Sequence, residues 1–270
     1  MSVSSDSLRR RVALVTGATG LLGKKHCEAL AREGATVVAT DLDGDACAAL
    51  AGELEGRFGV LAVGERLDVT SDVEVGALAA RLAKRFGPLD VLVNNAAIDD
   101  KVVAGAPLVR FEDYDVERFR RQLDVNVTGV FLCCQRFGAL MAERGSGSIV
   151  NVASTYGLVA PDQSLYRRPD GSQALIKGPA YPASKAAVIH LTRYLAAYYG
   201  QRNVRVNALV PGGVEAGQEP WFRAAYSART ALGRMALPDD YQGALVFLAS
   251  EASAYMTGAT LVLDGGFTAV

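Results

Sequence analysis

The chain has 270 residues, 50% of them hydrophobic, and a formal net charge of −1. A chain of this length can bury a full core within one domain. No basic run in the sequence is long enough to suggest a nucleic-acid footprint, so no nucleic-acid partner is expected. There are two histidines, and the four cysteines are not spaced as metal ligands, so we expect no metal site.

The N-terminal residues 1–10 lack the apolar core of a signal peptide. No apolar run approaches the ~20 residues of a membrane span. We therefore expect a cytoplasmic protein with reduced thiols and no membrane partner, whose first ten residues have no fixed structure.

Short apolar, β-branched runs alternate with helical stretches along the chain. The predicted strands are 12–16, 36–40, 61–67, 91–94, 148–153, 204–209 and 260–263. The predicted helices are 21–32, 44–58, 72–86, a longer region around 114–144, 181–199 and 241–249. Because the strands are continuously apolar, they are expected to be buried on both faces. The pattern predicts one α/β domain over residues 11–270, a doubly wound parallel sheet in three layers.

Three glycines follow the first predicted strand and open the first predicted helix. Gly17 can make a tight turn, Gly20 lets the backbone approach a pyrophosphate, and Gly23 allows close helix–strand contact. The helix N-terminus would offer N–H groups and a positive dipole end to the phosphates. The pattern favours a dinucleotide site over a turn that merely uses glycine.

Asp41 ends the second predicted strand, close to the spacing at which a carboxylate binds the adenosine ribose. A carboxylate here would repel a 2′-phosphate, so NAD(H) is favoured over NADP(H). Lys24 and Lys25 lie near enough to weaken this argument if they are not simply solvated.

Tyr181 and Lys185 lie four residues apart at a predicted helix start, which places both on one helix face. The ordinary pKa of tyrosine, about 10, is too high for easy proton transfer at neutrality. A nearby ammonium would favour the phenolate and lower this pKa. Taken alone, the pair is equally consistent with an accidental spacing on a helix.

In their order along the chain, these motifs resemble the short-chain dehydrogenase/reductase family over nearly its whole length. The resemblance rests on Thr16–Gly23, Asp41, Asp68, Val69, Asn94–Ala97, Asn126, Ser154, Tyr181, Lys185, Pro211, Gly212 and Asp264–Gly266. It implies a Rossmann-like fold, an oxidoreductase moving hydride between a nicotinamide and a small-molecule secondary alcohol or ketone, and a homotetramer or dimer.

The resemblance also implies individual roles. Tyr181 would be the general acid/base, Lys185 would bind the nicotinamide ribose and lower the tyrosine pKa, and Ser154 would hydrogen-bond the reacting oxygen. Asn126 would hold a water that links Lys185 to solvent. The implied cofactor-binding residues are Gly17, Thr19, Gly20, Leu21, Leu22, Asp41, Leu42, Asp68, Val69, Asn95, Ala96, Ala97, Tyr181, Lys185, Pro211, Gly212, Gly213 and Val214.

The sequence departs from the family pattern at several points. The middle glycine falls at Gly20 rather than at the position of Leu21, which resembles the epimerase-like branch of the superfamily. Ala97 and Ala216 replace a common glycine and threonine. Two alternatives therefore stay open, a nucleotide-sugar epimerase or dehydratase and a non-catalytic NAD(H)-binding regulator.

The largest departure is the loop 156–179, which makes the interval from Ser154 to Tyr181 roughly twice the family norm. Joining two catalytic positions, it is expected beside the substrate mouth. We expect Gln163, Tyr166, Arg167 and Arg168 to bind a polar substrate, such as a sugar, sugar phosphate or other polyol. A solvated loop or a subunit contact is the alternative. The segment 213–237 is expected to form a substrate lid or, alternatively, a surface helix.

Overall fold

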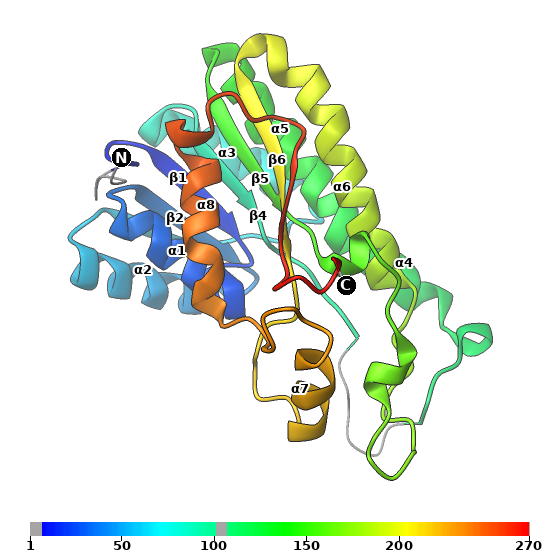
Figure 1. The fold of residues 1–270 in the computed structure, drawn as a ribbon. Helices are drawn as coiled ribbons and strands as arrows, with labels where there is room; N and C mark the ends of the chain where they lie inside the picture. Colours follow the sequence, from blue (N-terminus) through cyan, green and yellow to red (C-terminus); the bar gives the residue numbers. More distant parts are fainter. Residues whose placement is uncertain (1–6, 101–106, 270) are drawn as a thin grey trace.

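The computed structural model describes residues 7–100 and 107–269, which build one parallel sheet flanked by helices (Figure 1). Within these residues, seven strands follow the order β3-β2-β1-β4-β5-β6-β7. They are β1 Val12–Thr16, β2 Thr36–Asp41, β3 Ala62–Arg66, β4 Val91–Asn94, β5 Gly147–Val152, β6 Val204–Pro211 and β7 Thr260–Leu263. The strand order reverses between β1 and β4, and ligands of such sheets bind outside the carboxyl ends of the strands at that point.

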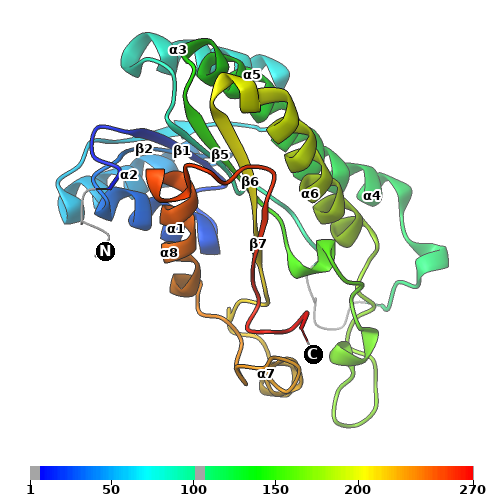
Figure 2. The ribbon, with the colours of Figure 1, turned by 45° about the horizontal axis from the view of Figure 1, so that its top comes forward.

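Helices cover both faces of this sheet (Figures 1 and 2). They are α1 Leu21–Arg32, α2 Gly44–Phe58, α3 Asp72–Phe86, α4 Val116–Leu123, α5 Gly129–Arg144, α6 Ala180–Tyr199, α7 Pro220–Ser227 and α8 Gln242–Ala249. Residues of α1, α2 and α8 form one apolar core with the strands, and residues of α3, α5 and α6 form the other. The strands are buried from both sides, which explains why they are continuously apolar. The predicted three-layer, Rossmann-like α/β fold is confirmed.

The predicted elements agree with the structure to within two residues at each end. The exception is α7, which lies inside the segment 213–237 and was not predicted as a helix. Its eight residues carry aromatic rings at Trp221, Phe222 and Tyr226, without the longer periodic pattern that identifies the other helices.

The long helical region predicted around 114–144 contains a π-helical turn, Asp124–Thr128, between α4 and α5. Such a turn inserts an extra residue into the helical repeat and is frequent at functional sites. Here it buries the side chain of Asn126, which is only 1% exposed.

The whole region Val116–Arg144 is the single helix of the described chain that is long and apolar enough, by those two criteria, to cross a membrane. The sequence prediction considered uninterrupted apolar runs and therefore did not identify this helix as a candidate span. More than half of its most apolar window, 56%, is buried inside the fold, with Phe137 and Met141 in the core. Packing against the sheet therefore accounts for its composition.

The N-terminal segment differs in part from the expectation for residues 1–10. Leu8 is 1% exposed and belongs to the core beneath α1. Its backbone N–H donates to the carbonyl of Glu33, and the Ser7 hydroxyl donates to the Glu33 carboxylate at 2.8 Å. A buried leucine anchors this end, so the ordered chain includes residues 7–10; residues 1–6 lie outside the described residues.

The loop 156–179 and the segment around α7 lie together at one end of the sheet (Figures 1 and 2). Leu165 and Tyr166 of the loop are buried against Tyr226 and Met235. The rings of Tyr166 and Phe222 lie 5.5 Å apart. We call this aromatic cluster the cap; it joins two segments that are distant in sequence.

Helix α2 lies so close to β3 that only glycine fits at position 64. A Cβ on Gly64 would overlap the backbone of Cys47 and Ala48. We expect Gly64→Ala to lower the free energy of unfolding by about 1–3 kcal/mol, because the helix must move away from the sheet. Urea-induced unfolding followed by circular dichroism measures this change.

Gly56→Ala is the matched control, because Gly56 lies within α2 at a position where a Cβ would meet open space. It should raise the free energy of unfolding by about 0.5–1 kcal/mol through better helix propensity. Equal stabilities for Gly64→Ala and the wild type would contradict the packing argument.

Candidate active site

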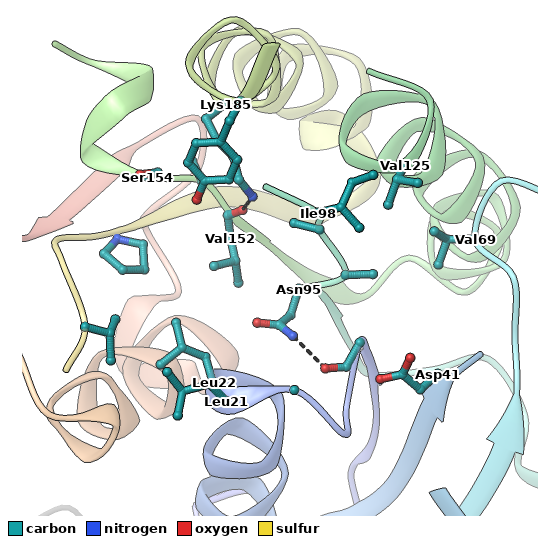
Figure 3. Close-up of a pocket in the computed structure, with 18 of the residues that line it drawn as sticks. Leu21, Leu22, Asp41, Val69, Asn95, Ile98, Val125, Val152, Ser154 and Lys185 are labelled. Atoms are coloured by element: carbon teal, nitrogen blue, oxygen red, sulfur yellow. Dashed lines mark hydrogen bonds between the residues drawn. The ribbon is translucent and has the colours of Figure 1, made fainter. Parts of the chain in front are cut away.

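A cleft of about 390 Å³ opens at the carboxyl ends of the strands (Figure 3). It brings together most of the residues predicted to bind cofactor or to act in catalysis. These are Gly17, Gly20, Leu21, Leu22, Asp41, Leu42, Asp68, Val69, Asn95, Ala96, Ala97, Ser154, Tyr181, Lys185, Pro211, Gly212 and Val214. Among the predicted residues, all of which are described, Thr19, Gly213 and Asn126 do not line it.

The glycine-rich turn after β1 is held by Asn95, which follows β4. The Asn95 amide donates to the backbone carbonyl of Gly17 at 2.9 Å (Figure 3). It also donates to the backbone carbonyl of Thr16 at 3.0 Å. Gly17 has φ +62°, and a Cβ there would lie 2.7 Å from the Cα of Ala96. The backbones of β1 and β4 thus meet at the switch point with no room for a side chain.

The N-terminus of α1 faces the same cleft. Its N-cap is Gly20, without a side-chain cap, and the first turn carries no acidic residue. N–H groups of a first helical turn need an acceptor from outside the helix. This end of the helix is therefore suited to the phosphates of a dinucleotide.

Asp41 lies at the tip of β2 and borders the cleft. One of its oxygens accepts hydrogen bonds from the backbone N–H and the hydroxyl of Thr19, at 3.0 and 2.6 Å. Thr19 therefore does not line the cleft itself but orients the Asp41 carboxylate that does. Lys25 is engaged elsewhere, in ion pairs with Glu28 and Asp239.

Tyr181, Lys185 and Ser154 lie at the other end of the cleft. The ammonium of Lys185 lies 5.6 Å from the centre of the Tyr181 ring and donates to the carbonyl of Val152 at 2.8 Å. Ser154 begins the short 3-10 turn after β5, where its hydroxyl accepts from the N–H of Tyr156 at 3.2 Å. It therefore caps a turn and lines the cleft at the same time.

Burial alters the protonation of both members of the pair. Burial raises the pKa of Tyr181 above its ordinary value, Asp99 adds to the rise, and a hydrogen bond to Ser154 opposes it. Burial lowers the pKa of Lys185 from 10.5 to about 8. Without a bound cofactor, burial is thus the largest influence on the pKa of Tyr181 and acts against the phenolate.

Asn126 connects the π-helical turn to the catalytic helix. Its amide oxygen accepts from the N–H of Ile98 at 2.8 Å, and its nitrogen donates to the Ile98 carbonyl at 2.9 Å. The same nitrogen donates to the hydroxyl of Ser184 at 3.0 Å, one residue before Lys185. In this structure Asn126 braces the site from behind rather than facing the cleft.

The four loop residues expected to contact substrate lie away from this cleft. Tyr166 is buried in the cap and its hydroxyl pairs with that of Tyr156 at 3.0 Å. Gln163 bonds to the backbone of Lys177. Arg168 closes its own loop on Ser172, and Arg167 is exposed.

Several lining residues had not been predicted from the sequence. They are Leu67, Ile98, Arg121, Val125, Val152 and Ala153. All but Arg121 are apolar and lie at strand ends or in the packed helical region, where the same residue types form the core. Their closeness in sequence to Asp68, Ala97, Asn126 and Ser154 was the only available signal.

The parallel sheet, the glycine turn and the buried tyrosine–lysine pair define a dinucleotide-dependent oxidoreductase site. Residues 17–268 match the family described as enoyl-(acyl carrier protein) reductase. The D-threitol dehydrogenase of Mycolicibacterium smegmatis is 39% identical over 99% of this chain and 97% of its own length. The cis-4-hydroxycyclohexanecarboxylate dehydrogenase of Sinomonas cyclohexanicum is 38% identical over 98% and 99%.

Among solved structures, a short-chain type dehydrogenase/reductase from Mycobacterium marinum superposes with a TM-score of 0.85 and 34% identity, with all of both chains covered. The chain therefore belongs to the short-chain dehydrogenase/reductase family. It is an oxidoreductase of the CH–OH groups of secondary alcohols and uses a nicotinamide cofactor. These predictions from the sequence are confirmed.

The buried charge of Lys185 leads to a prediction about stability. Between about pH 8 and 10.5 the unfolded chain keeps the proton of this lysine while the folded protein loses it. The lysine therefore makes the free energy of unfolding rise with pH across this window. At neutral pH the burial of the charge is destabilising, so Lys185→Met should raise the free energy of unfolding by about 1–3 kcal/mol.

Urea unfolding of wild type and Lys185→Met from pH 7 to 10.5, without cofactor, measures both effects. The stabilising effect of Lys185→Met should shrink as pH rises. Lys84→Met, at an exposed position on α3, should change neither stability nor its pH dependence. Parallel pH profiles for wild type and Lys185→Met would contradict the argument.

Proposed function

We propose that this protein is an NAD(H)-dependent dehydrogenase in which Tyr181 exchanges a proton with the hydroxyl of a secondary alcohol or the oxygen of its ketone. The observation that carries the proposal is the cleft itself. Ser154, Tyr181 and Lys185 lie at one end, and Asp41 and the glycine turn at the other. An extended dinucleotide would span this interval with its nicotinamide beside the tyrosine.

The residues of the cleft fit such a cofactor. The uncapped N-terminus of α1 suits the pyrophosphate, and the missing Cβ of Gly17 lets the backbones of β1 and β4 meet beneath it. Asp68 and Val69 would contact the adenine, and Pro211 to Val214 would flank the nicotinamide. Of these, Gly213 does not line the cleft, and its N–H donates to the Tyr226 hydroxyl, so it would hold the backbone beside the nicotinamide in place.

The preference for NAD(H) over NADP(H) rests on charge. Thr19 aims the Asp41 carboxylate toward the position expected for the adenosine ribose, where it would accept from a 2′-hydroxyl and repel a 2′-phosphate. Lys25 cannot offset this repulsion, because Glu28 and Asp239 already pair with it. Lys24 is exposed and is the remaining cation of this turn.

The nicotinamide, when bound, supplies or accepts the hydride. For alcohol oxidation, Tyr181 as phenolate removes the hydroxyl proton of the substrate; for ketone reduction, the phenol donates it. Ser154 donates to the same substrate oxygen and holds it in place. Lys185 stabilises the phenolate by its charge and would bind the nicotinamide ribose.

Asn126 serves this reaction by positioning. Its amide hydrogen-bonds to Ile98 at the cleft wall and to Ser184 on α6. Because Ser184 directly precedes Lys185, these bonds hold Lys185 in position beside the cleft. An amide oxygen can accept two hydrogen bonds, and Ile98 uses one of them. The second could hold the water that would link Lys185 to solvent.

The two relatives described above support an alcohol on a small carbon skeleton as the substrate. They are named for D-threitol and for a hydroxycyclohexanecarboxylate. A phosphorylated substrate was suggested by Arg167 and Arg168, but Arg167 is exposed and Arg168 closes its own loop on Ser172. We therefore propose an unphosphorylated secondary alcohol. The epimerase alternative rested on Gly20 alone, and these relatives are named as dehydrogenases.

We further propose that the segment 213–237 acts as a lid and that the enzyme is a cytoplasmic homotetramer or dimer. Within this segment the Gly213 N–H donates to the Tyr226 hydroxyl, and Phe222 and Tyr226 pack on Leu165 and Tyr166 of the loop 156–179. Tyr255 is fully exposed near the apolar C-terminal end, as expected of a subunit contact.

The role of Tyr181 can be tested by Tyr181→Phe, which removes only the hydroxyl. We expect kcat to fall by about 10²–10⁴-fold, the usual contribution of general acid/base catalysis, with NADH binding unchanged. Absorbance at 340 nm measures turnover across a panel of secondary alcohols, and NADH fluorescence measures binding. Tyr194→Phe, on an exposed face of the same helix, is the control. NADH binding without turnover by the wild type would instead support a regulator.

The cofactor preference can be tested by Asp41→Ser. Removing the carboxylate should reduce the ratio of kcat/KM for NAD⁺ over NADP⁺ at least tenfold, about 1.4 kcal/mol. The matched control is Asp43→Asn, because Asp43 caps α2 and an asparagine caps equally well. An unchanged ratio in Asp41→Ser would overturn the assignment.

A further inference from the structure

A second lysine reaches the catalytic tyrosine from the loop 156–179. The ammonium of Lys177 lies 5.1 Å from the centre of the Tyr181 ring and 5.9 Å from that of Tyr156. Its side chain is 6% exposed and pairs with the carboxylate of Asp99, whose side chain is 34% exposed. A buried lysine beside the reacting residue requires an explanation, since removing an ammonium from water is unfavourable.

Both members of the pair are held by further contacts. The side-chain amide of Gln163 accepts from the N–H of Lys177 at 2.8 Å and donates to its carbonyl at 3.1 Å. These two hydrogen bonds within the loop therefore fix the backbone of Lys177 in space. Gln163, expected to bind substrate, instead positions Lys177, whose ammonium lies 5.1 Å from the centre of the Tyr181 ring.

The segment carrying Asp99 is anchored through its neighbour Asp100. That carboxylate accepts from the Tyr114 hydroxyl at 2.8 Å, from Arg118 at 2.8 Å and from Gln122 at 2.6 Å. Asp100 also packs against Gly178, where any Cβ would overlap it. Lys177 and Asp99 are thus held together by two separately anchored segments.

The chemistry of the pair indicates what it can bind. A lone buried ammonium would select an anion, but the Asp99 carboxylate already neutralises Lys177 and would repel a second negative charge. Together they still present an ammonium donor and a partly exposed carboxylate acceptor. A hydroxyl group, which both donates and accepts, matches this combination.

We propose that Lys177 and Asp99 bind a second hydroxyl of the substrate, adjacent to the one on which Tyr181 acts. The enzyme would then prefer vicinal diols and polyols to simple secondary alcohols and to hydroxy acids. This inference rests on the proposed function, because it takes Tyr181 as the reacting group. The function of the loop 156–179 would then be to place Lys177, a residue that determines substrate specificity, beside Tyr181.

The experiment compares two substrates that differ only in the second hydroxyl, 1,2-cyclohexanediol and cyclohexanol. NADH formation at 340 nm gives kcat and KM for the wild type, Lys177→Met and Asp99→Asn. Lys177→Met should lower kcat/KM for the diol at least tenfold more than it lowers kcat/KM for cyclohexanol, mainly through KM. Thermal unfolding confirms that each variant is folded.

Asp99→Asn leaves Lys177 without its anionic partner. It should also lower kcat/KM for the diol, and it should raise kcat/KM for 3-hydroxycyclohexanecarboxylate at least threefold, since the unpaired ammonium then attracts a carboxylate. Asp170→Asn, at the exposed tip of the same loop, should leave all three substrates unaffected.

Equal losses for diol and cyclohexanol in Lys177→Met would show that the pair is structural and overturn the proposal. So would unchanged kinetics in that variant. If the wild type oxidises cyclohexanol but no vicinal diol in a panel that includes 2,3-butanediol and threitol, the diol inference fails and the proposed function stands. If it oxidises none of these alcohols, both fail.

Discussion

The active site depends on a positive charge held where water is scarce. Lys185 donates to the carbonyl of Val152 at the end of β5, and burial lowers its pKa to about 8. One hydrogen bond to a backbone carbonyl does not replace the hydration of an ammonium. The charge is therefore unfavourable for the protein alone; in the proposed reaction a phenolate and the ribose hydroxyls of a cofactor would surround it and make it useful. Natural enzymes commonly accept such a loss of stability at the site of their chemistry.

The parallel sheet explains how residues so far apart in sequence reach this charge. Every strand presents its carboxyl end at one edge, so Asp41 after β2, Asn95 after β4 and Ser154 after β5 line a single cleft. The reversal of strand order between β1 and β4 opens that edge to a ligand. Tyr181 and Lys185 come from α6, and Asn126 braces this helix through Ser184. The order and direction of the strands thus bring the site residues together, and a few buried hydrogen bonds fix their positions.

Much of this could be predicted from the sequence, for physical reasons. Strands buried on both faces are continuously apolar, and the glycine turn leaves a pattern because close backbone approach excludes side chains. The apolar cleft wall, such as Val152 and Ile98, could not be predicted, because valine and isoleucine there look like core residues. The roles of the residues in the loop 156–179 were harder still to predict. Its arginines suggested ligand binding, whereas Tyr166 is buried in a second apolar cluster and Lys177 reaches the tyrosine. Which loop residue turns inward depends on packing between distant segments.

That packing has a consequence for how the active site opens. Tyr166 of the loop packs on Phe222 and Tyr226 of the segment around α7, and Asp162 pairs with Arg229 at 2.7 Å. Separating the two segments would expose several aromatic rings to water, so moving them together is the less unfavourable path. The same loop carries Lys177, which Gln163 fixes to it. If the segment 213–237 moves as the proposed lid, its motion would be transmitted to Lys177, and closure over the substrate would coincide with the proposed recognition of its hydroxyls.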